Sequence, residues 1–348
     1  MKERLFRLAG ALILIGSFVA GWLLISYQQF VDQPMTISTA VPAMLQVKPG
    51  SSLRSIAASL QQQGLVADGR YFVWMARLRS QASRIQAGEY QIEAGMTPAQ
   101  LLDGMVSGRV RQYAITVPEG WTFRQMMAKV DANPYLEHRL TGLVDEEVMA
   151  RLGHAGEHPE GRFFPDTYHF PRGLSDVEFL QRAYQAMAQR LEQEWSGRAE
   201  GLPLKSPYEA LILASIVEKE TGAPRERGEI AGLFIRRLQK GMRLQTDPTV
   251  IYGIGPGYDG NIRKSDLQRD TPYNTYTRKG LPPTPIAIPG GDALHAALHP
   301  VAGESLYFVA RGDGTHHFSA SLEEHECAVV RYQIRGRDCS HPNFRPEQ

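Results

Sequence analysis

The sequence predicts an α+β protein with a single N-terminal transmembrane helix, a small β-α module and a larger mixed α+β domain. Three observations lead to this prediction. An apolar run without charged residues lies near the start of the 348-residue chain. A strand–turn–helix pattern then occurs three times before residue 127. After residue 161 the chain changes to long helical stretches and a loop region rich in Gly, Pro and Tyr.

Composition and charge exclude several classes of protein. Hydrophobic residues make up 43% and charged residues 22%, which is too apolar for a disordered chain and too mixed for a polytopic membrane protein. The formal net charge is +1, whereas nucleic-acid binding needs a clear basic excess, so we expect no nucleic-acid partner. Two cysteines exclude a disulfide-stapled scaffold and a four-cysteine zinc site. The sequence leaves open whether Cys327 and Cys339 form a disulfide.

The first element is the apolar run from Leu8 to Ile25. As a helix it spans roughly 27 Å, close to the thickness of a bilayer core. Basic residues precede it and aromatic residues mark its far end, so the positive-inside rule places residues 1–7 in the cytoplasm and residues 8–27 in the membrane. The remaining chain is then outside the cytoplasm. The alternative is a cleaved signal peptide with a distant site near Ala40, although the apolar run is long for one.

The second element is a repeated pattern that follows a linker at residues 28–44. Each copy has an alternating apolar strand, a Gly turn and a helix whose N-cap is a hydroxyl residue, because the hydroxyl accepts a hydrogen bond from a free amide at the helix start. The copies lie at 45–56, 90–101 and 115–126, with Ser52, Thr97 and Thr122 as N-caps. The first copy resembles the glycan-binding LysM module, which suggests a LysM-like subdomain at 45–110. A plain β-α packing unit without a ligand is the alternative.

The larger domain is predicted to contain several helices, a long loop region and a final hairpin. The helices lie at 175–195, 206–221 and 226–240, the loop region at 252–291, the hairpin at 305–319 and a last helix at 321–334. A loop region of that length usually has a function. The helix at 206–221 begins with Ser206 as N-cap, has Glu209 in place for a capping box, and ends before Gly222.

The same helix carries the most informative side chains. Residues 210–217 are apolar except for Ser215, and a helix that is apolar on all sides is buried. Glu218 lies on a buried face, and both desolvation and the negative end of the helix dipole raise the pKa of such a carboxyl toward that of a general acid. Glu220 is about 200° further round, so it points elsewhere. The alternative is that both glutamates are exposed at a helix end.

Several motifs together resemble those of the endolytic murein transglycosylase, or YceG-like, family. They are EGRFFPDTY at 160–168, ASIVEKETG at 214–222, LQTDPTVIYG at 244–253, YNTY at 273–276 with GLPPTPI at 280–286, and SLYFVA at 305–310. The resemblance covers essentially the whole chain, with small departures at Arg162 and at Ala287 or Ile288. It implies a catalytic domain at 111–340 and a C-terminal tail at 341–348. It also implies the inner membrane of a bacterium, with the catalytic domain in the periplasm.

The resemblance implies a carbon–oxygen lyase that cuts the β-1,4 bond between N-acetylmuramic acid and N-acetylglucosamine within nascent peptidoglycan strands. Such an enzyme leaves 1,6-anhydro ends, terminates elongation and has peptidoglycan synthases, the penicillin-binding proteins, as partners. Glu218 is then the catalytic residue: it protonates the leaving oxygen and afterwards accepts the proton of the sugar's 6-hydroxyl, so a second carboxylate is not needed. Candidate substrate-binding residues, with loop packing as the alternative, are Glu220, Gln245, Thr246, Asp247, Tyr252, Tyr273, Asn274, Tyr276 and Asp166.

We expect neither a metal nor a cofactor. His316, His317, His325 and Cys327 lack the spacing of known metal motifs, and the glycines at 253–257 do not connect a strand to a helix as a dinucleotide site requires. Two other functions stay open. One is a hydrolytic muramidase in which Glu220 or Asp166 activates water, and the other is a wall-binding scaffold without enzymatic activity.

Overall fold

The computed structural model describes residues 2–37 and 42–334, so Cys339 and the predicted tail at 341–348 lie outside the described residues. It has a mixed α+β architecture, as predicted, in which the strands described form two-stranded sheets. The chain divides into two compact units. The first is Met1–Tyr113 with His169–Gly173, and the second is Ala114–Tyr168 with Leu174–Gln348.

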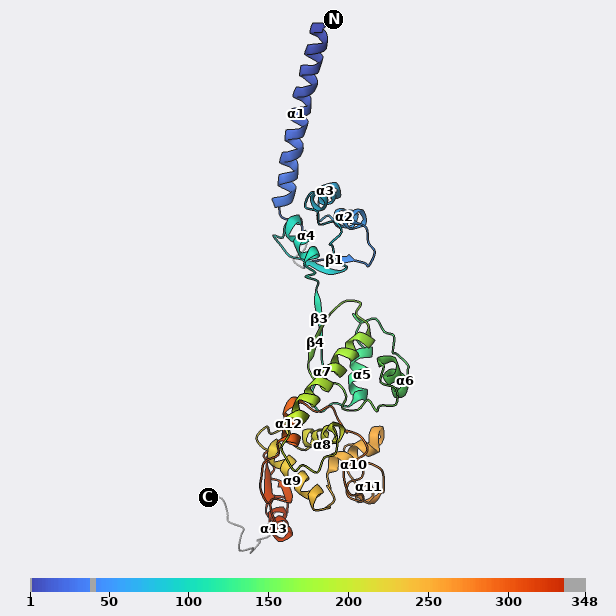
Figure 1. Cartoon of the computed structure of the whole chain (residues 1–348), viewed down its shortest axis with the longest axis vertical. Coiled ribbons are helices and arrows are strands. Elements are labelled where there is room, and N and C mark those ends of the chain that lie inside the picture. Colours follow the sequence, from blue (N-terminus) through green and yellow to red (C-terminus); the bar gives the residue numbers. More distant parts are fainter. Residues whose placement is uncertain (1, 38–41, 335–348) are drawn as a thin grey trace. The chain divides into compact units, whose positions relative to one another are not determined.

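Helix α1 (Lys2–Asp32) contains the predicted apolar run (Figure 1). Within the described residues, its segment Ala9–Asp32 is the one helix long and apolar enough to cross a membrane. The helix continues through residues 28–32, which the sequence assigns to a linker. The reason is packing: the ring of Phe30 stacks on Tyr71 with 5.5 Å between centroids, and Val31 is buried in the core of the first unit.

The rest of the first unit is a small module around one core. Its elements are β1 (Ala43–Val47), α2 (Leu53–Gln62), α3 (Gly69–Leu78), β2 (Gly88–Ile92) and α4 (Pro98–Val106). The two strands pair antiparallel with Leu45 opposite Tyr90. Ser52 and Thr97 cap their helices as predicted. Helix α3 was not predicted, and the likeness to LysM stays a prediction.

The second unit holds most of the helices. In chain order the remaining elements are β3 (Gln112–Thr116), α5 (Phe123–Asp131), α6 (Asp145–Leu152), β4 (Thr167–Pro171), α7 (Asp176–Ser196), α8 (Pro207–Glu220), α9 (Arg227–Gln239), α10 (Asp247–Ile254), the 3-10 turn η1 (Gly255–Gly257), α11 (Lys264–Gln268), α12 (Gly291–Leu298), β5 (Tyr307–Ala310), β6 (His316–Ser319) and α13 (Leu322–Tyr332). The predicted helices correspond to α7, α8, α9 and α13, and the predicted hairpin to β5 and β6. The loop region expected at 252–291 contains the end of α10, the turn η1 and α11, and neither α6 nor α12 was predicted.

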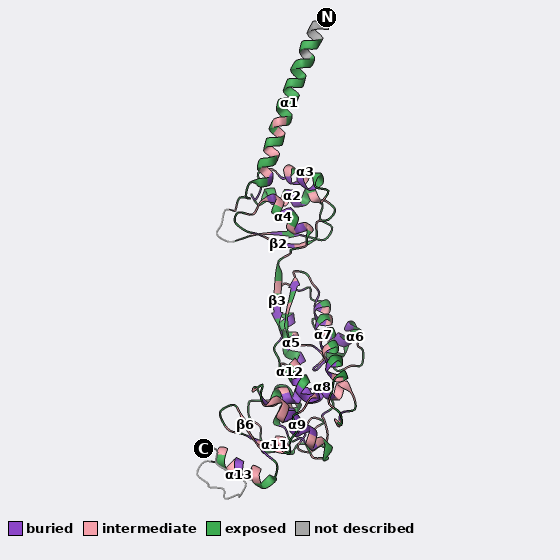
Figure 2. Cartoon of the chain, turned by 60° about the vertical axis from the view of Figure 1, so that its left-hand side comes forward, coloured by how far each residue is buried: buried purple, intermediate pink, exposed green. Residues whose placement is uncertain are grey.

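Helix α8 lies in the centre of the hydrophobic core of the second unit, in contact with α7, α9 and α12. Every residue from Ala210 to Val217 is buried, which confirms the predicted burial on all sides (Figure 2). The hydroxyl of Ser206 accepts a hydrogen bond from the Glu209 amide, as an N-cap should. The predicted capping box is wrong in one detail: the Glu209 carboxylate accepts from the amide of Lys205, at 2.6 Å.

Candidate active site

Glu218 stands in the last turn of α8 with only 7% of its side chain exposed. Its Oε2 accepts a hydrogen bond of 3.0 Å from the amide of Gly290, at the N-terminus of α12. Its Oε1 lies 3.7 Å from Nη2 of Arg227, at the start of α9. The prediction that Glu218 is buried is therefore confirmed, and the alternative of a solvent-exposed helix end is wrong.

The surroundings of Glu218 act on its pKa in both directions. Burial raises this pKa most, the nearby Glu119 raises it further, and the Gly290 amide and Arg227 lower it. Nη2 of Arg227 is also 3.7 Å from the Glu119 carboxylate, so the two carboxylates share one guanidinium. The net effect is a raised pKa, which keeps part of the Glu218 population protonated closer to neutral pH.

The segment that carries Gly290 is fixed to α8 by a second polar contact. Ser215, in the apolar part of the helix, accepts a hydrogen bond of 3.0 Å from the Ile286 amide and donates one of 2.7 Å to the Ile212 carbonyl. The same segment is also bound to the loop before α5: the Ile288 carbonyl accepts from the Gly120 amide, and the Ile288 amide donates to the Trp121 carbonyl. The Glu218 carboxyl and the Gly290 amide that binds it are thus held in one rigid frame.

Glu220 has entirely different neighbours, as its angular separation from Glu218 predicts. Thr246 donates its hydroxyl to the Glu220 carboxylate, and the carboxylate is almost fully buried. Burial raises the pKa of Glu220 to about 7; Asp247 adds to this rise, while the hydrogen bond from Thr246 and the charges of His316 and Arg237 oppose it. A second carboxyl that is partly protonated at neutral pH therefore lies two residues from the first.

Glu220 also lines a cavity of about 480 Å³. Four of the predicted substrate-binding residues meet in its wall: Glu220, Gln245, Asp247 and Tyr276. Tyr276 donates its hydroxyl to Asp247 at 2.6 Å. The opposite wall comes from β5, β6 and α13 and was not predicted to take part; it contributes Tyr307, His316 and His325.

Gln245 has an unusual backbone conformation in this wall. Its φ is +50°, a value that residues other than glycine adopt rarely. Its amide donates to the Thr275 carbonyl, and the next amide, of Thr246, donates to the Thr275 hydroxyl at 3.1 Å. Strained residues of this kind persist only where the surrounding structure holds them in place, and they cluster at active sites and ligand-binding sites.

Five predicted residues lie outside the cavity wall: Thr246 binds Glu220, as described above, and three others fix the loops around the cavity. Tyr252 donates its hydroxyl to Glu160 at 3.0 Å, and its ring meets that of Tyr273 edge-on with 5.0 Å between centroids. The hydroxyl of Tyr273 is hydrogen-bonded to the hydroxyl of Thr284. Asn274 is buried, and its amide donates to three backbone carbonyls, those of Asp266, Leu267 and Arg269.

Asp166, the remaining predicted residue, is exposed at the start of β4. Its carboxylate accepts a hydrogen bond from the next amide, that of Thr167. Among the described contacts, none joins Asp166 to Glu218 or Glu220.

Sequence reasoning missed several charged groups that the structure places near this region. Glu160 is 3% exposed, accepts hydrogen bonds from the Phe123 amide and from Tyr252, and has a pKa that burial raises to about 7. Glu226 accepts from both the amide and the ring of His316 at the cavity. Glu160 is the first residue of the EGRFFPDTY motif, but no local periodicity distinguishes Glu160 or Glu226 from a surface glutamate.

A model of the YceG-like family matches residues 45–331. The chain belongs to the YceG-like family. It is similar to an endolytic murein transglycosylase of Bacillus subtilis (strain 168), with 31% identity over 338 residues that cover 92% of this chain and 91% of that protein. An endolytic murein transglycosylase of Streptococcus pneumoniae serotype 2 is 25% identical over 342 residues, which cover 88% of this chain and 61% of that longer protein.

A solved structure agrees with these relatives. The 2.6 Å crystal structure of a YceG-like protein from Listeria monocytogenes superposes with a TM-score of 0.54 and 29% sequence identity. The match covers 83% of this chain and 99% of that chain. The predicted YceG-type fold of the larger domain is thereby confirmed.

Proposed function

We propose that this YceG-like protein is an endolytic lytic transglycosylase that cleaves the MurNAc–GlcNAc β-1,4 bond of nascent peptidoglycan strands and so terminates their elongation. The relatives named above supply the substrate class. The observation that carries the proposed chemistry is the buried carboxyl of Glu218, with a raised pKa, beside one cation and one amide donor. This arrangement suits a group that gives a proton and then takes one back.

In the first step, protonated Glu218 donates its proton to the glycosidic oxygen, and the bond between that oxygen and the anomeric carbon breaks. The resulting carboxylate is stabilised by Arg227 and by the Gly290 amide, which lie 3.7 and 3.0 Å from its two oxygens. Both contacts strengthen as charge develops on Glu218, so they favour the proton transfer.

In the second step, the 6-hydroxyl of the same muramyl residue attacks the anomeric carbon. Its proton passes to the Glu218 carboxylate, which restores the starting state of the enzyme. The new bond between the 6-oxygen and the anomeric carbon closes the 1,6-anhydro ring. Water is not consumed, and one carboxyl serves both steps.

We further propose that the cavity beside Glu220 binds a sugar unit of the strand. Its wall combines hydroxyl, carboxyl and guanidinium groups with aromatic rings, a mixture suited to sugar hydroxyls and apolar sugar faces. Nδ1 of His325 is buried without a hydrogen-bond partner in the described chain, and burial and Arg237 lower the pKa of this histidine. A sugar hydroxyl would satisfy the neutral ring nitrogen.

A hydrolytic muramidase is the second candidate, and one observation favours it. Inverting hydrolysis needs a second carboxylate about 6.5–9.5 Å from the acid to activate water. Glu119 and Glu218 both lie 3.7 Å from the guanidinium of Arg227, so Glu119 is a carboxylate near the acid that could activate water. Glu220, in the cavity wall, is the other candidate for this role. The two reactions differ by one water in the product.

The test is product analysis on purified glycan strands by mass spectrometry. The wild type is expected to give internal cleavage products with anhydro ends, and Glu218→Gln to give none. Glu209→Gln places the same substitution at the other end of α8 and is the matched control, with unchanged products expected. Retained cleavage by Glu218→Gln would refute the assignment of the acid, and reducing ends in place of anhydro ends would favour the muramidase. A scaffold without activity would give no cleavage even in the wild type.

We also propose that α1 is an uncleaved anchor in the inner membrane, with residues 1–7 in the cytoplasm, and that the chain after the anchor lies in the periplasm beside peptidoglycan synthases. The support is that the end of the helix belongs to the core: Val31 and Met35 are buried, and the Met35 amide donates to the Met96 carbonyl. Cleavage near residue 40 would remove them. An N-terminal epitope tag should therefore stay on the full-length chain, and its loss from the mature protein would contradict the anchor.

A further inference from the structure

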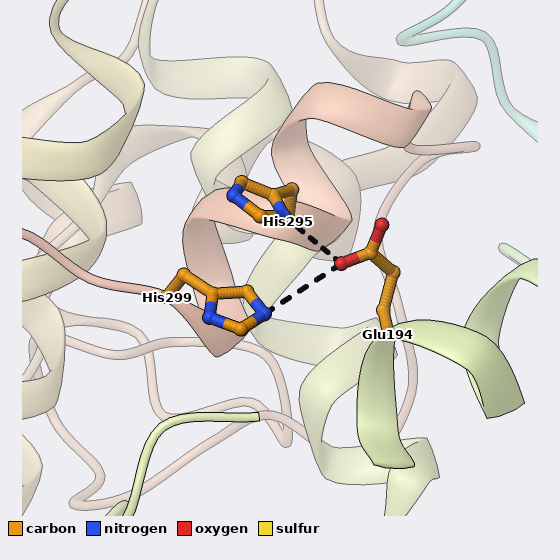
Figure 3. A group of neighbouring side chains, drawn as sticks. All are labelled: Glu194, His295 and His299. Atoms are coloured by element: carbon orange, nitrogen blue, oxygen red, sulfur yellow. Dashed lines mark hydrogen bonds and ion pairs between the residues drawn. The ribbon is translucent and has the colours of Figure 1, made fainter. Parts of the chain in front are cut away.

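Helices α7 and α12 bring together three side chains that the proposed reaction does not use. Glu194 is on α7, His295 is in the last turn of α12, and His299 is the residue that directly follows that helix (Figure 3). Nδ1 of His295 lies 3.0 Å and Nε2 of His299 lies 3.8 Å from the same oxygen, Oε2 of Glu194. The two imidazole rings stack with 4.3 Å between their centroids.

We propose that these three residues bind a divalent transition-metal ion, with Zn²⁺ as the expected occupant. The three potential ligand atoms all lie within 4.8 Å of one another. Ligands on a tetrahedral zinc with bonds of roughly 2.0–2.1 Å are about 3.3 Å apart, so only small rotamer changes would close the site. Two imidazoles and one carboxylate suit zinc, whereas Ca²⁺ and Mg²⁺ prefer all-oxygen sites.

The supporting contacts fit an ion at this point. Arg190, one turn before Glu194, holds the other oxygen of its carboxylate at 2.9 Å, which leaves Oε2 directed at the histidines. Partners of this kind orient a metal ligand and fix its geometry. The side chain of Glu194 is only 10% exposed, whereas that of His295 is 60% exposed, so an ion can enter from solvent without unfolding.

The role that follows is structural, because the ion would connect two helices of the second unit. Helix α12 begins at Gly291, directly after the amide that binds Glu218, and the guanidinium of Arg190 lies against Gly291. An ion that joins α7 to the far end of α12 would restrict movement of that amide. Binding itself does not depend on the proposed function, and it can be measured without any glycan.

The experiment uses the full-length chain in detergent, stripped with EDTA and freed of the chelator. Calorimetric titration with ZnCl₂ should show one ion per chain, and CoCl₂ should give the visible absorption of a four- or five-coordinate ion. His295→Ala, His299→Ala and Glu194→Gln should each weaken zinc binding by more than about tenfold, since loss of even an outer partner costs about 10–100-fold. Zinc should also raise the melting temperature of the wild type and not of these variants.

His154→Ala is the matched control, because His154 lies 3.8 Å from the Glu157 carboxylate and stacks on a tyrosine ring, Tyr184, instead of a second histidine. It should bind zinc as the wild type does. Equal melting temperatures of all proteins in EDTA would show that the variants are folded. Absence of stoichiometric binding to the wild type, or binding that the three variants leave unchanged, would overturn the proposal; the latter would place the ion at other histidines.

Discussion

Replacing Glu160 with Gln should stabilise the protein at alkaline pH and leave its stability nearly unchanged in acid. Burial raises the pKa of Glu160 from 4.5 to about 7 in the folded state. Below pH 4.5 the carboxyl is protonated in both states. Between pH 4.5 and about 7 the folded state holds a proton that the unfolded state has lost, so stability falls over this range, and above pH 7 the loss is complete. At 1.36 kcal/mol for each unit of pKa, the full loss is about 3 kcal/mol.

Glutamine resembles the protonated acid in shape and hydrogen bonding. It can still accept from the Phe123 amide, and it carries no charge beside Tyr252. Urea unfolding of the full-length chain in detergent, followed by tryptophan fluorescence at about pH 4 and about pH 8.5, gives the free energies of unfolding. We expect the Glu160→Gln difference to be near zero at the lower pH and about 3 kcal/mol stabilising at the higher pH.

The exposed Glu192→Gln on α7 is the control, and its effect should be small at both pH values. A Glu160→Gln variant that is less stable than the wild type by the same amount at both values would refute the reasoning. That result would mean that the hydrogen bonds of the carboxylate, and not its desolvation, dominate at this position.

Three further outcomes follow from the site. Ser215→Ala should cost about 1–3 kcal/mol in urea unfolding, because the buried Ile286 amide loses its acceptor; a cost below about 0.5 kcal/mol would contradict that. Gly290→Ala should lower the pH at which the rate falls on the alkaline side, because a φ of −78° suits alanine but its Cβ would displace the Glu119 carboxylate, which raises the pKa of Glu218; an unchanged pH profile would contradict that. The rate against pH should fall on the alkaline side as Glu218 loses its proton, and Arg227→Ala should move this fall to higher pH, because Arg227 lowers the pKa of Glu218; a shift to lower pH would contradict the assignment.

Much of the fold could be predicted because its causes are local. A hydroxyl followed by an apolar helical face predicts Ser52, Thr97 and Thr122 as N-caps, and all three accept the expected hydrogen bond. The uninterrupted apolar run of α8 predicts burial without any tertiary information. Helix α12 was missed because it has only eight residues, because its N-cap and first residue are the glycines Gly290 and Gly291, and because the rest offer little periodicity.

The neighbours of Glu218 could not be predicted by such reasoning. Glu119, Arg227 and Gly290 come from three segments that meet only in the folded chain. Each looks ordinary in its own sequence context, and the electrostatic result depends on which of them arrives within a few ångströms of the carboxyl. The burial of Glu220 illustrates the same limit, since its Thr246 partner and the opposite wall of the cavity are set by tertiary structure.

The two polar contacts between α8 and the 286–290 segment have a consequence for changes in chain length. Ser215 and Glu218 are three residues apart on one helix, and they bind the amides of Ile286 and Gly290, which are four residues apart on the other segment. Because the rise per residue of an α-helix is fixed, the helix sets the distance between the two amides that the loop must match. Insertion or deletion of one residue between Ile286 and Gly290 would leave one of the two amides out of register. Side-chain replacements in the 286–290 segment leave both hydrogen bonds possible, because this segment contributes only backbone amides to them.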